Sequence, residues 1–216
     1  KKTMMVAQQL YEGIEVSGET AGLITYMRTD SVNLSEEALS QIRELIAEKY
    51  GKENVPKEPR SFKTKSKNAQ EAHEAIRPTS VTNLPERIQN HLSADQFKLY
   101  QLIWKRTVAC QMTHATLNQV SVDLSCGSKD NIFRATGSTI AKPGFMAVYL
   151  EGKDDSKEND DKESFLPPME EGRPVPLNDI IATQHFTEPP PRYGEASLVK
   201  SLEEHGIGRP STYATI

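Results

Sequence analysis

The spacing of apolar residues changes once along this chain, and that change limits the folds open to it. In the first half, apolar residues recur every three to four positions, which is the repeat of an amphipathic helix. One such face follows the cap residues Asn33 and Ser35 and ends at Gly51, and a second follows Ser93. From about Ala115 the repeat becomes two, which is typical of a strand with one buried face. The residues that carry these repeats are Ala38, Leu39, Ile42, Leu45 and Ile46, then Phe97, Tyr100, Ile103, Trp104, Thr107 and Val108, then Val120, Val122 and Leu124. The chain is therefore predicted to be α+β, with helices first and a small antiparallel sheet after them.

Two further apolar runs, residues 132–135 and 145–150, are predicted to add strands to this sheet. The stretch from Lys153 to Glu163 has almost no apolar residues, so burial there cannot offset the entropy of ordering. We expect this stretch to be the tip of a hairpin, and we assign it no function.

The last part of the chain is predicted to be extended and then helical. Three prolines at 189–191 indicate a stiff connector, and residues 195–205 follow with a helical pattern. A glycine turn comes next, and a new helix is expected to open around Pro210. Two helices joined by a glycine turn are weakly indicative of nucleic-acid binding, although most such pairs are only structural.

The charge of the chain argues against a generally basic nucleic-acid-binding protein. The formal net charge is −4 over 216 residues. Residues 151–163 hold seven acidic residues against three lysines and so account for all of it. Positive charge dominates another stretch, residues 57–67, in which Glu58 is the single acidic residue. This stretch either contacts phosphates or is a solvated loop. Its basic residues are Lys57, Arg60, Lys63, Lys65 and Lys67.

The cysteine content and the absence of long apolar runs predict the compartment. Cys110 and Cys126 lack the spacing of zinc ligands, and the sequence holds no signal peptide and no run long enough to span a membrane. We expect a cytoplasmic protein without a membrane partner.

The segment around Tyr26 is the strongest candidate for chemistry. Residues 23–31 are β-prone and end in turn and cap residues; if they are extended, Tyr26, Arg28 and Asp30 project to one side. A phenol has a pKa of about 10, so its attack at neutral pH needs a nearby cation or base. Arg28 suits that role, and it equally suits clamping a phosphate. Asp30 either orients Arg28 or caps the turn before the next helix.

Three separated segments resemble motifs of the bacterial type IA DNA topoisomerases, and they occur in the same order. They are Thr-Tyr-Met-Arg-Thr-Asp-Ser at 25–31, Glu-Ala-His-Glu-Ala-Ile-Arg-Pro at 71–78 and Gly-Ile-Gly-Arg-Pro-Ser-Thr-Tyr-Ala at 206–214. The resemblance covers essentially the whole chain. Met27 follows the tyrosine where the topoisomerase III branch typically has proline, so the topoisomerase I branch is favoured over a topoisomerase III-type decatenase.

The resemblance implies a reaction. Tyr26 would attack a phosphodiester of single-stranded DNA, keep the 5′ phosphate as a phosphotyrosine and release a 3′ hydroxyl. The other strand would pass through the gap before the hydroxyl reverses the attack, which relaxes negatively supercoiled duplex DNA. One ester replaces another, so ATP is not needed, and the sequence contains no phosphate-binding Gly-x-x-x-x-Gly-Lys-Ser/Thr loop.

The resemblance also implies supporting roles for other residues in the three motifs. Tyr26 and Arg28 would be catalytic, and Thr25 and Asp30 would support them. His73 would contact DNA near the active site or assist proton transfer. Arg77 lies four residues after His73 on the same expected helical face and would be a phosphate or structural partner. Arg209, Ser211 and Thr212 lie where a helix is expected to begin. They would either bind a phosphate there or simply cap the helix.

The family implies a ring-shaped enzyme with a moving gate. Residues 1–114 would be the helical gate domain that carries the tyrosine, residues 115–185 part of a β-rich arch, and residues 186–216 the start of a DNA-binding domain. The intact enzyme is expected to be monomeric and to lie with the nucleoid.

The same resemblance predicts that this chain is an internal piece of a longer polypeptide. Both ends of the sequence fall inside helical patterns. The Mg²⁺-binding acidic half of the family would lie before Lys1, so no metal ligand is assigned here. We expect the chain alone not to relax DNA.

Two competing interpretations differ in their tests. A non-catalytic single-stranded DNA-binding module would keep all its activity in Tyr26→Phe, whereas the enzyme would lose covalent trapping and keep DNA binding. An interaction domain that recruits a basic partner through its acidic stretch would lose that partner when 154–161 is deleted.

Overall fold

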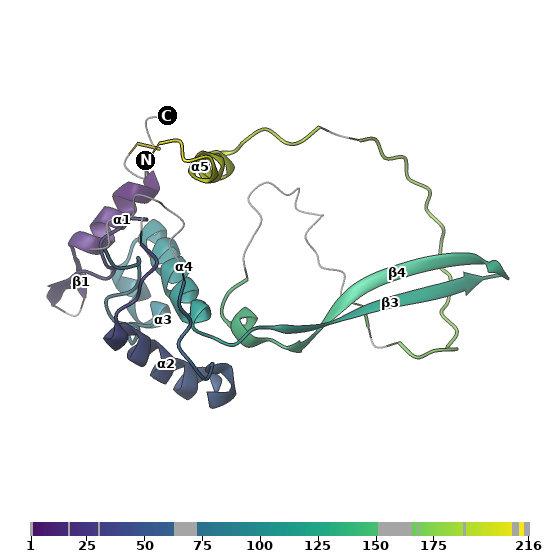
Figure 1. Ribbon diagram of the computed structural model, residues 1–216, viewed down its shortest axis with the longest axis horizontal. Coiled ribbons are helices and arrows are strands. Elements are labelled where there is room, and N and C mark those ends of the chain that lie inside the picture. Colours follow the sequence, from purple (N-terminus) through teal and green to yellow (C-terminus); the bar gives the residue numbers. More distant parts are fainter. Residues whose placement is uncertain are drawn as a thin grey trace. The chain divides into compact units, whose positions relative to one another are not determined.

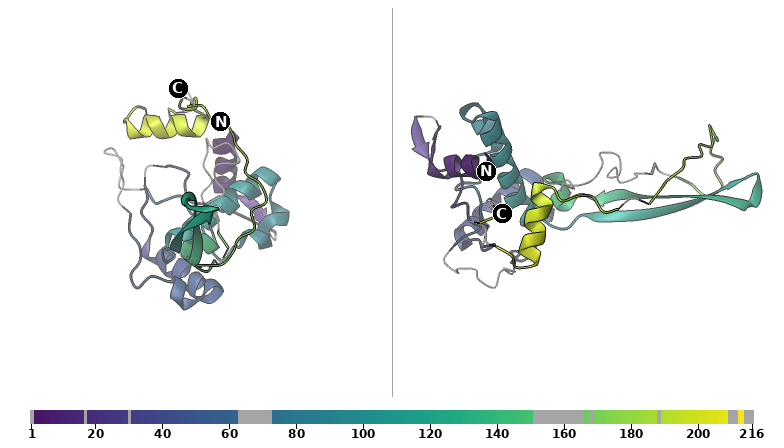
Figure 2. Two further views of the ribbon diagram at one scale, coloured as in Figure 1. Left: turned by 90° about the vertical axis from the view of Figure 1, so that its right-hand side faces the viewer. Right: turned by 90° about the horizontal axis from the view of Figure 1, so that it is seen from above.

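In the computed structural model, drawn in Figures 1 and 2, the chain forms two compact units. The first unit draws on residues 1–115, 143–151 and 202–216, and the second on residues 116–142 and 152–201. The structure describes residues 2–16, 18–29, 31–62, 73–150, 166–167, 169–187, 189–208 and 212–213.

Three helices dominate the first unit: α1 (Lys2–Glu12), α2 (Glu36–Tyr50) and α4 (Ala94–Cys110). The shorter elements between α2 and α4 are η1 (Lys52–Asn54), α3 (Pro85–Ile88) and η2 (Gln89–His91). Ser35 caps α2 by accepting the Ala38 N–H at 3.3 Å, and Ser93 forms a reciprocal capping box with Gln96 at the start of α4. Gly51 ends α2 at a φ of 95°, which an L side chain rarely adopts. Both predicted helices are confirmed.

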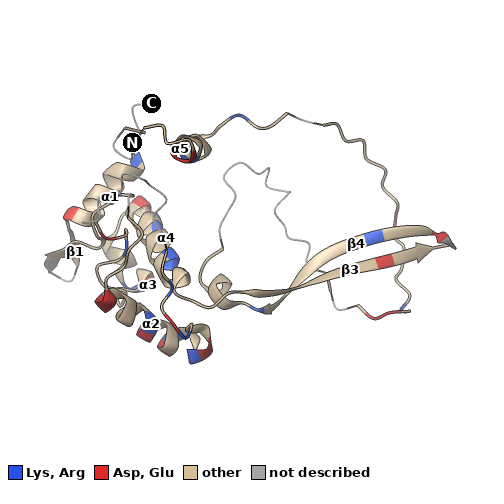
Figure 3. Cartoon of the chain, viewed as in Figure 1, with Lys and Arg blue, Asp and Glu red and all other residues tan. Residues whose placement is uncertain are grey.

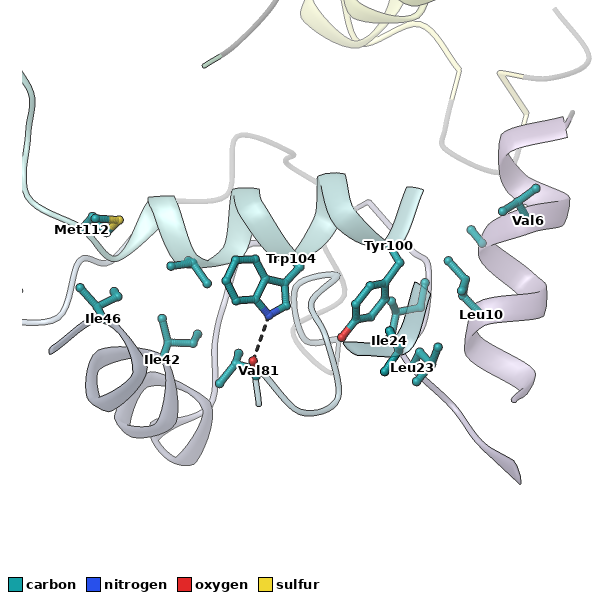
Figure 4. Packing of buried hydrophobic residues seen from close by; sticks show 13 residues of the cluster. Val6, Leu10, Leu23, Ile24, Ile42, Ile46, Val81, Tyr100, Trp104 and Met112 are labelled. Atoms are coloured by element: carbon teal, nitrogen blue, oxygen red, sulfur yellow. Dashed lines mark hydrogen bonds between the residues drawn. The ribbon is translucent and has the colours of Figure 1, made fainter. Parts of the chain in front are cut away.

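The core of this unit lies around α4, which packs against α1, α2 and the loop after Pro78 (Figure 4). The Trp104 indole donates to the Val81 carbonyl at 2.9 Å, and the Tyr100 hydroxyl donates to the Asn83 carbonyl at 2.7 Å. Burial raises the pKa of Tyr100 far above its ordinary value, so the hydroxyl stays a donor. These two bonds fix the 79–84 loop on α4. The buried residues are Val6, Ala7, Leu10, Leu23, Ile24, Ile42, Ile46, Val81, Ile88, Tyr100, Trp104, Val108 and Met112.

A small hairpin interrupts the chain between α1 and Tyr26. Its strands, β1 (Ile14–Val16) and β2 (Glu19–Ala21), pair antiparallel with Ile14 opposite Ala21. Gly13 and Gly22 flank it, and the hairpin belongs to the first unit.

The second unit contains one long antiparallel hairpin, β3 (Thr116–Cys126) with β4 (Ser128–Lys142). The strands predicted from the two-residue repeat and from the 132–135 run are therefore confirmed, and they form a two-stranded sheet. Gly127 makes the turn at a φ of 75°. Asp123 and Arg134 face each other across the strands, with Nε and Oδ1 2.6 Å apart. Figure 3 shows few charged residues along this hairpin.

The prediction of a strand at 145–150 is wrong. The segment holds a 3₁₀ helix, η3 (Gly144–Ala147), which belongs to the first unit. Pro143 has no N–H for a strand ladder. Gly144 follows at a φ of 49°, and a Cβ at this position would clash with the His114 carbonyl. The Phe145 N–H then donates to the Thr113 carbonyl at 3.0 Å and fastens the turn.

The described residues between 169 and 194 form no helix or strand, and α5 (Glu195–Glu204) follows them. The helix predicted over 195–205 is confirmed to within one residue. The helix expected around Pro210 and the acidic 151–163 stretch lie outside the described residues.

Candidate active site

The segment that carries Tyr26 is fixed on both sides. Leu23 and Ile24 are each 1% exposed, so the chain before the tyrosine is anchored in the core. On one side, the Leu23 N–H donates to the Leu10 carbonyl near the end of α1 at 2.7 Å. On the other, Ile24 forms an antiparallel bridge with Pro78. Two parts of the chain that are distant in sequence thus fix the backbone that leads to Tyr26.

Thr25 adds a side-chain connection next to the tyrosine. Its hydroxyl donates to the Ala75 carbonyl at 2.8 Å and accepts the Arg77 N–H at 3.0 Å. Its own N–H donates to the Arg77 carbonyl at 2.9 Å. Hydrogen bonds from both its hydroxyl and its backbone therefore join Thr25 to the 75–77 segment.

The Tyr26 ring lies at the surface next to two other rings. It is 44% exposed, in contrast to the buried residues just before it. The Tyr11 ring meets it edge to face, with centroids 5.3 Å apart and planes at 61°. The His73 ring lies 6.0 Å from it, tilted by 34°. The structure thus brings Tyr26 and His73, from two separate motifs, into one site.

The sequence places Tyr26, Arg28 and Asp30 on one side only on the condition that residues 23–31 are extended, and the structure does not meet this condition beyond the tyrosine. The Arg28 N–H donates to the Tyr26 carbonyl at 2.9 Å, which closes a three-residue turn centred on Met27. Side chains do not alternate strictly through such a turn, so strand geometry no longer places Tyr26, Arg28 and Asp30 on one side of the chain. Arg28 is half-buried, and Asp30 lies outside the described residues.

The helical face expected to join His73 and Arg77 is absent, because residues 73–77 are not helical. Pro78 disfavours helical geometry at the residue before it, and the Arg77 N–H is already bound by Thr25. The Arg77 guanidinium donates to both Glu74 carboxylate oxygens, at 2.8 and 3.1 Å, and to the Pro78 carbonyl at 2.8 Å. In this arrangement Arg77 braces its own loop.

Glu74 extends this brace to α2. One of its carboxylate oxygens also accepts the Ser35 N–H, at 3.0 Å, from the residue that caps the helix. Partial burial opposes ionisation, but the hydrogen bonds from Arg77 and Ser35 prevail and hold the pKa of Glu74 below its ordinary value. The loop that presents His73 is thereby tied to the start of α2.

The third motif is described only in part. Arg209 and Ser211 lie outside the described residues, and Thr212 is exposed in a turn. In the basic stretch, Lys63, Lys65 and Lys67 also lie outside them, while the Arg60 guanidinium donates to the Met112 carbonyl at 3.2 Å. The phosphate-binding roles of these residues stay predictions.

No metal centre forms among the residues that the structure describes, since no three His, Cys, Asp or Glu side chains gather there in a metal-binding group. The described helices also include none that is long and apolar enough to cross a membrane.

Tyr11 and Gly22 are the residues of this site that the sequence reading missed. A Cβ on Gly22 would lie 2.5 Å from the Tyr11 carbonyl oxygen, so only glycine allows the chain to pass there. The available signal was the pair Gly13 and Gly22 at the two ends of the β1–β2 hairpin. Closure of that hairpin brings Tyr11 next to the segment that carries Tyr26.

Comparisons with known proteins agree over the full chain. The sequence profile of a DNA topoisomerase family matches residues 1–216. DNA topoisomerase 1 of Xylella fastidiosa (strain Temecula1 / ATCC 700964) is 58% identical over the whole chain, which covers 27% of that protein. DNA topoisomerase 1 of Rickettsia felis is 56% identical, with 28% of its length covered. Full-length topoisomerase I from Thermotoga maritima has a similar structure, with a TM-score of 0.71 and 36% identity over 99% of this chain and 33% of that one. The chain thus spans about a quarter of the length of these curated relatives.

Proposed function

The chain belongs to the DNA topoisomerase family, and from that premise we propose that it is the nucleophile-bearing part of a type IA enzyme of the topoisomerase I branch. Tyr26 is the proposed nucleophile. The observation that carries this proposal is the contrast between the exposed Tyr26 ring and the buried, doubly fixed segment that leads to it. A nucleophile needs access to its substrate and a backbone that does not move, and Tyr26 combines the two.

In the proposed reaction the Tyr26 oxygen attacks a phosphorus atom of single-stranded DNA. A bond forms between that oxygen and the 5′ phosphate while the bond to the 3′ oxygen breaks. The phenol loses its proton, and the departing 3′ oxygen gains one. One phosphodiester replaces another, so the reverse attack by the 3′ hydroxyl reseals the strand without ATP. Passage of the other strand through the gap would relax negatively supercoiled DNA.

The neighbouring residues take complementary roles in this proposal. His73 lies beside the Tyr26 ring, close enough to contact DNA at the cut or to assist the proton transfers. Arg28 follows Tyr26 through a tight turn and would clamp the phosphate or favour the phenolate. Thr25 and Arg77 pair with each other next to the bridge between Ile24 and Pro78 and hold the backbone there.

The domain roles follow from the same premise. Residues 1–114 would form the gate that carries the tyrosine, residues 115–185 part of the arch, and residues 186–216 the start of a DNA-binding domain. The described residues do not form a Mg²⁺ site. As the resemblance to type IA enzymes implies, the ligands of a Mg²⁺ ion would lie in other parts of the polypeptide. The intact enzyme would act as a monomer on single-stranded and negatively supercoiled DNA.

Covalent trapping tests the proposal. The intact polypeptide that contains this chain is mixed with Mg²⁺ and a 3′-labelled single-stranded oligonucleotide, denatured and separated on a gel beside Tyr26→Phe. We expect a labelled protein band in the wild type and none in the variant, with equal DNA binding by both. The same label placed at the 5′ end should leave the protein unlabelled. If a folded wild type gives no band while it still binds DNA, the DNA-binding module becomes the better account.

A further inference from the structure

Tyr11 makes a contact with Tyr26 that core packing does not explain. Tyr11 is 41% exposed and Tyr26 is 44% exposed, so both rings lie at the surface. They nevertheless meet edge to face at 5.3 Å, within the range where aromatic pairs attract. Two exposed rings in contact contribute little to the buried core, so the contact needs another explanation.

The backbone beneath this pair is built so that the two rings stay together. Tyr11 lies in the last turn of α1, and the Leu10 carbonyl beside it accepts the Leu23 N–H at 2.7 Å. The Tyr11 carbonyl faces Gly22 so closely that any side chain there would collide with it. The Gly22 carbonyl in turn accepts the Thr79 hydroxyl at 2.7 Å. Tyr11 is thus tied to the same short segment that presents Tyr26.

A fixed backbone does not by itself fix an exposed ring. The Tyr26 side chain can still rotate about its own bonds unless neighbours limit it. Among the described residues, the rings of His73 and Tyr11 are the aromatic neighbours of the Tyr26 ring. In-line attack on phosphorus requires a well-defined position of the phenol oxygen, and a misplacement of about 1 Å can cost on the order of 100-fold in rate.

We infer that Tyr11 is a positioning residue for the nucleophile: its edge-to-face contact holds the Tyr26 ring in the orientation from which it attacks DNA. The inference rests on the proposed function and adds to it a residue from outside the three motifs. The Tyr11 aromatic ring performs this role, and its hydroxyl is not required. The contact acts on the rate of cleavage and not on the affinity for DNA.

Single-turnover cleavage of an oligonucleotide by the intact polypeptide tests the inference, with Tyr11→Leu and Tyr11→Phe compared at saturating DNA. Loss of an aromatic pair corresponds to a factor of about 2 to 12, so Tyr11→Leu should cleave about 3- to 10-fold more slowly. Tyr11→Phe keeps the ring and should match the wild type. DNA affinity should be the same in all three. Equal rates for Tyr11→Leu and the wild type would overturn the inference, as would a slow Tyr11→Phe.

A spectroscopic measurement separates positioning from a general loss of structure. With 3-fluorotyrosine placed at position 26, the ¹⁹F resonance reports the ring next to it. Tyr11→Leu should shift this resonance and Tyr11→Phe should leave it nearly unchanged, while the thermal unfolding midpoint stays close to that of the wild type. Gly22→Ala, which pushes on the Tyr11 backbone, should shift it as well. An unmoved resonance in Tyr11→Leu would overturn the inference.

The two proposals fail in different ways. Tyr26→Phe in the same cleavage assay tests only the proposed function, because it keeps the ring contact and removes the nucleophilic oxygen. If Tyr26→Phe still becomes joined to DNA, the proposed function is wrong. If Tyr26→Phe is inert while Tyr11→Leu cleaves normally, the proposed function stands and the role of Tyr11 is wrong.

Discussion

Thr25 is the residue that most directly joins the nucleophile segment to the rest of the site. Its hydroxyl donates to Ala75 and accepts from Arg77, and it directly precedes Tyr26. A hydroxyl that both donates and accepts locks the two backbone segments in one register. The chemistry assigned to Tyr26 therefore depends on a neighbour that need not touch DNA.

Thr25→Val is predicted to weaken the site, since valine keeps the shape and leaves the Arg77 N–H without its acceptor. Leaving a partly buried donor unsatisfied costs about 1–3 kcal/mol of unfolding free energy. Thr25→Ser, which keeps the hydroxyl, is the matched control and should lose much less. Urea unfolding of both variants measures the difference, and cleavage should slow in Thr25→Val alone. Equal stability in the two variants would show that these hydrogen bonds do not matter.

At the scale of elements, the brace formed by Glu74 connects α2 to the loop that presents His73. The carboxylate accepts from the Ser35 backbone at the α2 cap and from the Arg77 guanidinium inside the loop. Neither element alone determines where His73 lies. The brace therefore makes the site sensitive to the ionisation of one carboxyl group.

The pKa of Glu74 is lowered in the folded protein, so its stabilising contribution has a defined pH dependence. A carboxyl group of this kind stabilises fully above its unfolded pKa of about 4.5, and the contribution is lost as the pH falls through the lower folded value. Glu74→Gln should lower the thermal midpoint at neutral pH, and the gap to the wild type should close as the pH falls to about 3. A gap that stays constant across this range would contradict the assigned role of the charge.

The elements that were predicted correctly are those whose signals are local. For α2 and α4 the cap residue, the apolar repeat and the stop lie within one stretch of sequence, so Ser35 and Ser93 mark their starts correctly. The hairpin strands likewise follow their two-residue repeat.

The errors fall where distant partners decide the conformation. Residues 73–77 look helical in isolation, but Pro78 and the bonds to Thr25 keep them out of a helix. Pro143 and the contact of Gly144 with His114 turn the 145–150 run away from the sheet. The pairing of Tyr11 with Tyr26 depends on closure of the β1–β2 hairpin, and local sequence patterns do not report such a contact.

At the scale of the whole molecule, the chain corresponds to only part of the length of its relatives. It spans 27% of the Xylella relative and 33% of the Thermotoga structure. The described residues supply an accessible phenol, a nearby imidazole and a fixed backbone. They supply no group of metal-binding side chains.

If the Mg²⁺ ligands lie in other parts of the polypeptide, the 216-residue chain alone should leave negatively supercoiled plasmid unchanged. The intact polypeptide should relax the plasmid in the presence of Mg²⁺. The proposed function implies a ring-shaped enzyme, of which this chain would form only one part. Agarose-gel separation of topoisomers measures the outcome, with circular dichroism to show that the isolated chain is folded. Relaxation by the chain alone at rates near those of the intact protein would show that this chain does not depend on the other parts of the polypeptide.

The most direct test of the account is to identify the residue that becomes joined to DNA. The trapped covalent complex of the intact polypeptide is digested after glutamate, which places Tyr11 in a peptide that ends at Glu12 and Tyr26 in the peptide 20–36. Mass spectrometry then shows which of these two neighbouring tyrosines carries the nucleotide. The account predicts that the added mass lies on Tyr26, attached through the 5′ phosphate, and that Tyr11 is unmodified. A nucleotide on Tyr11, or on any residue other than Tyr26, would contradict it.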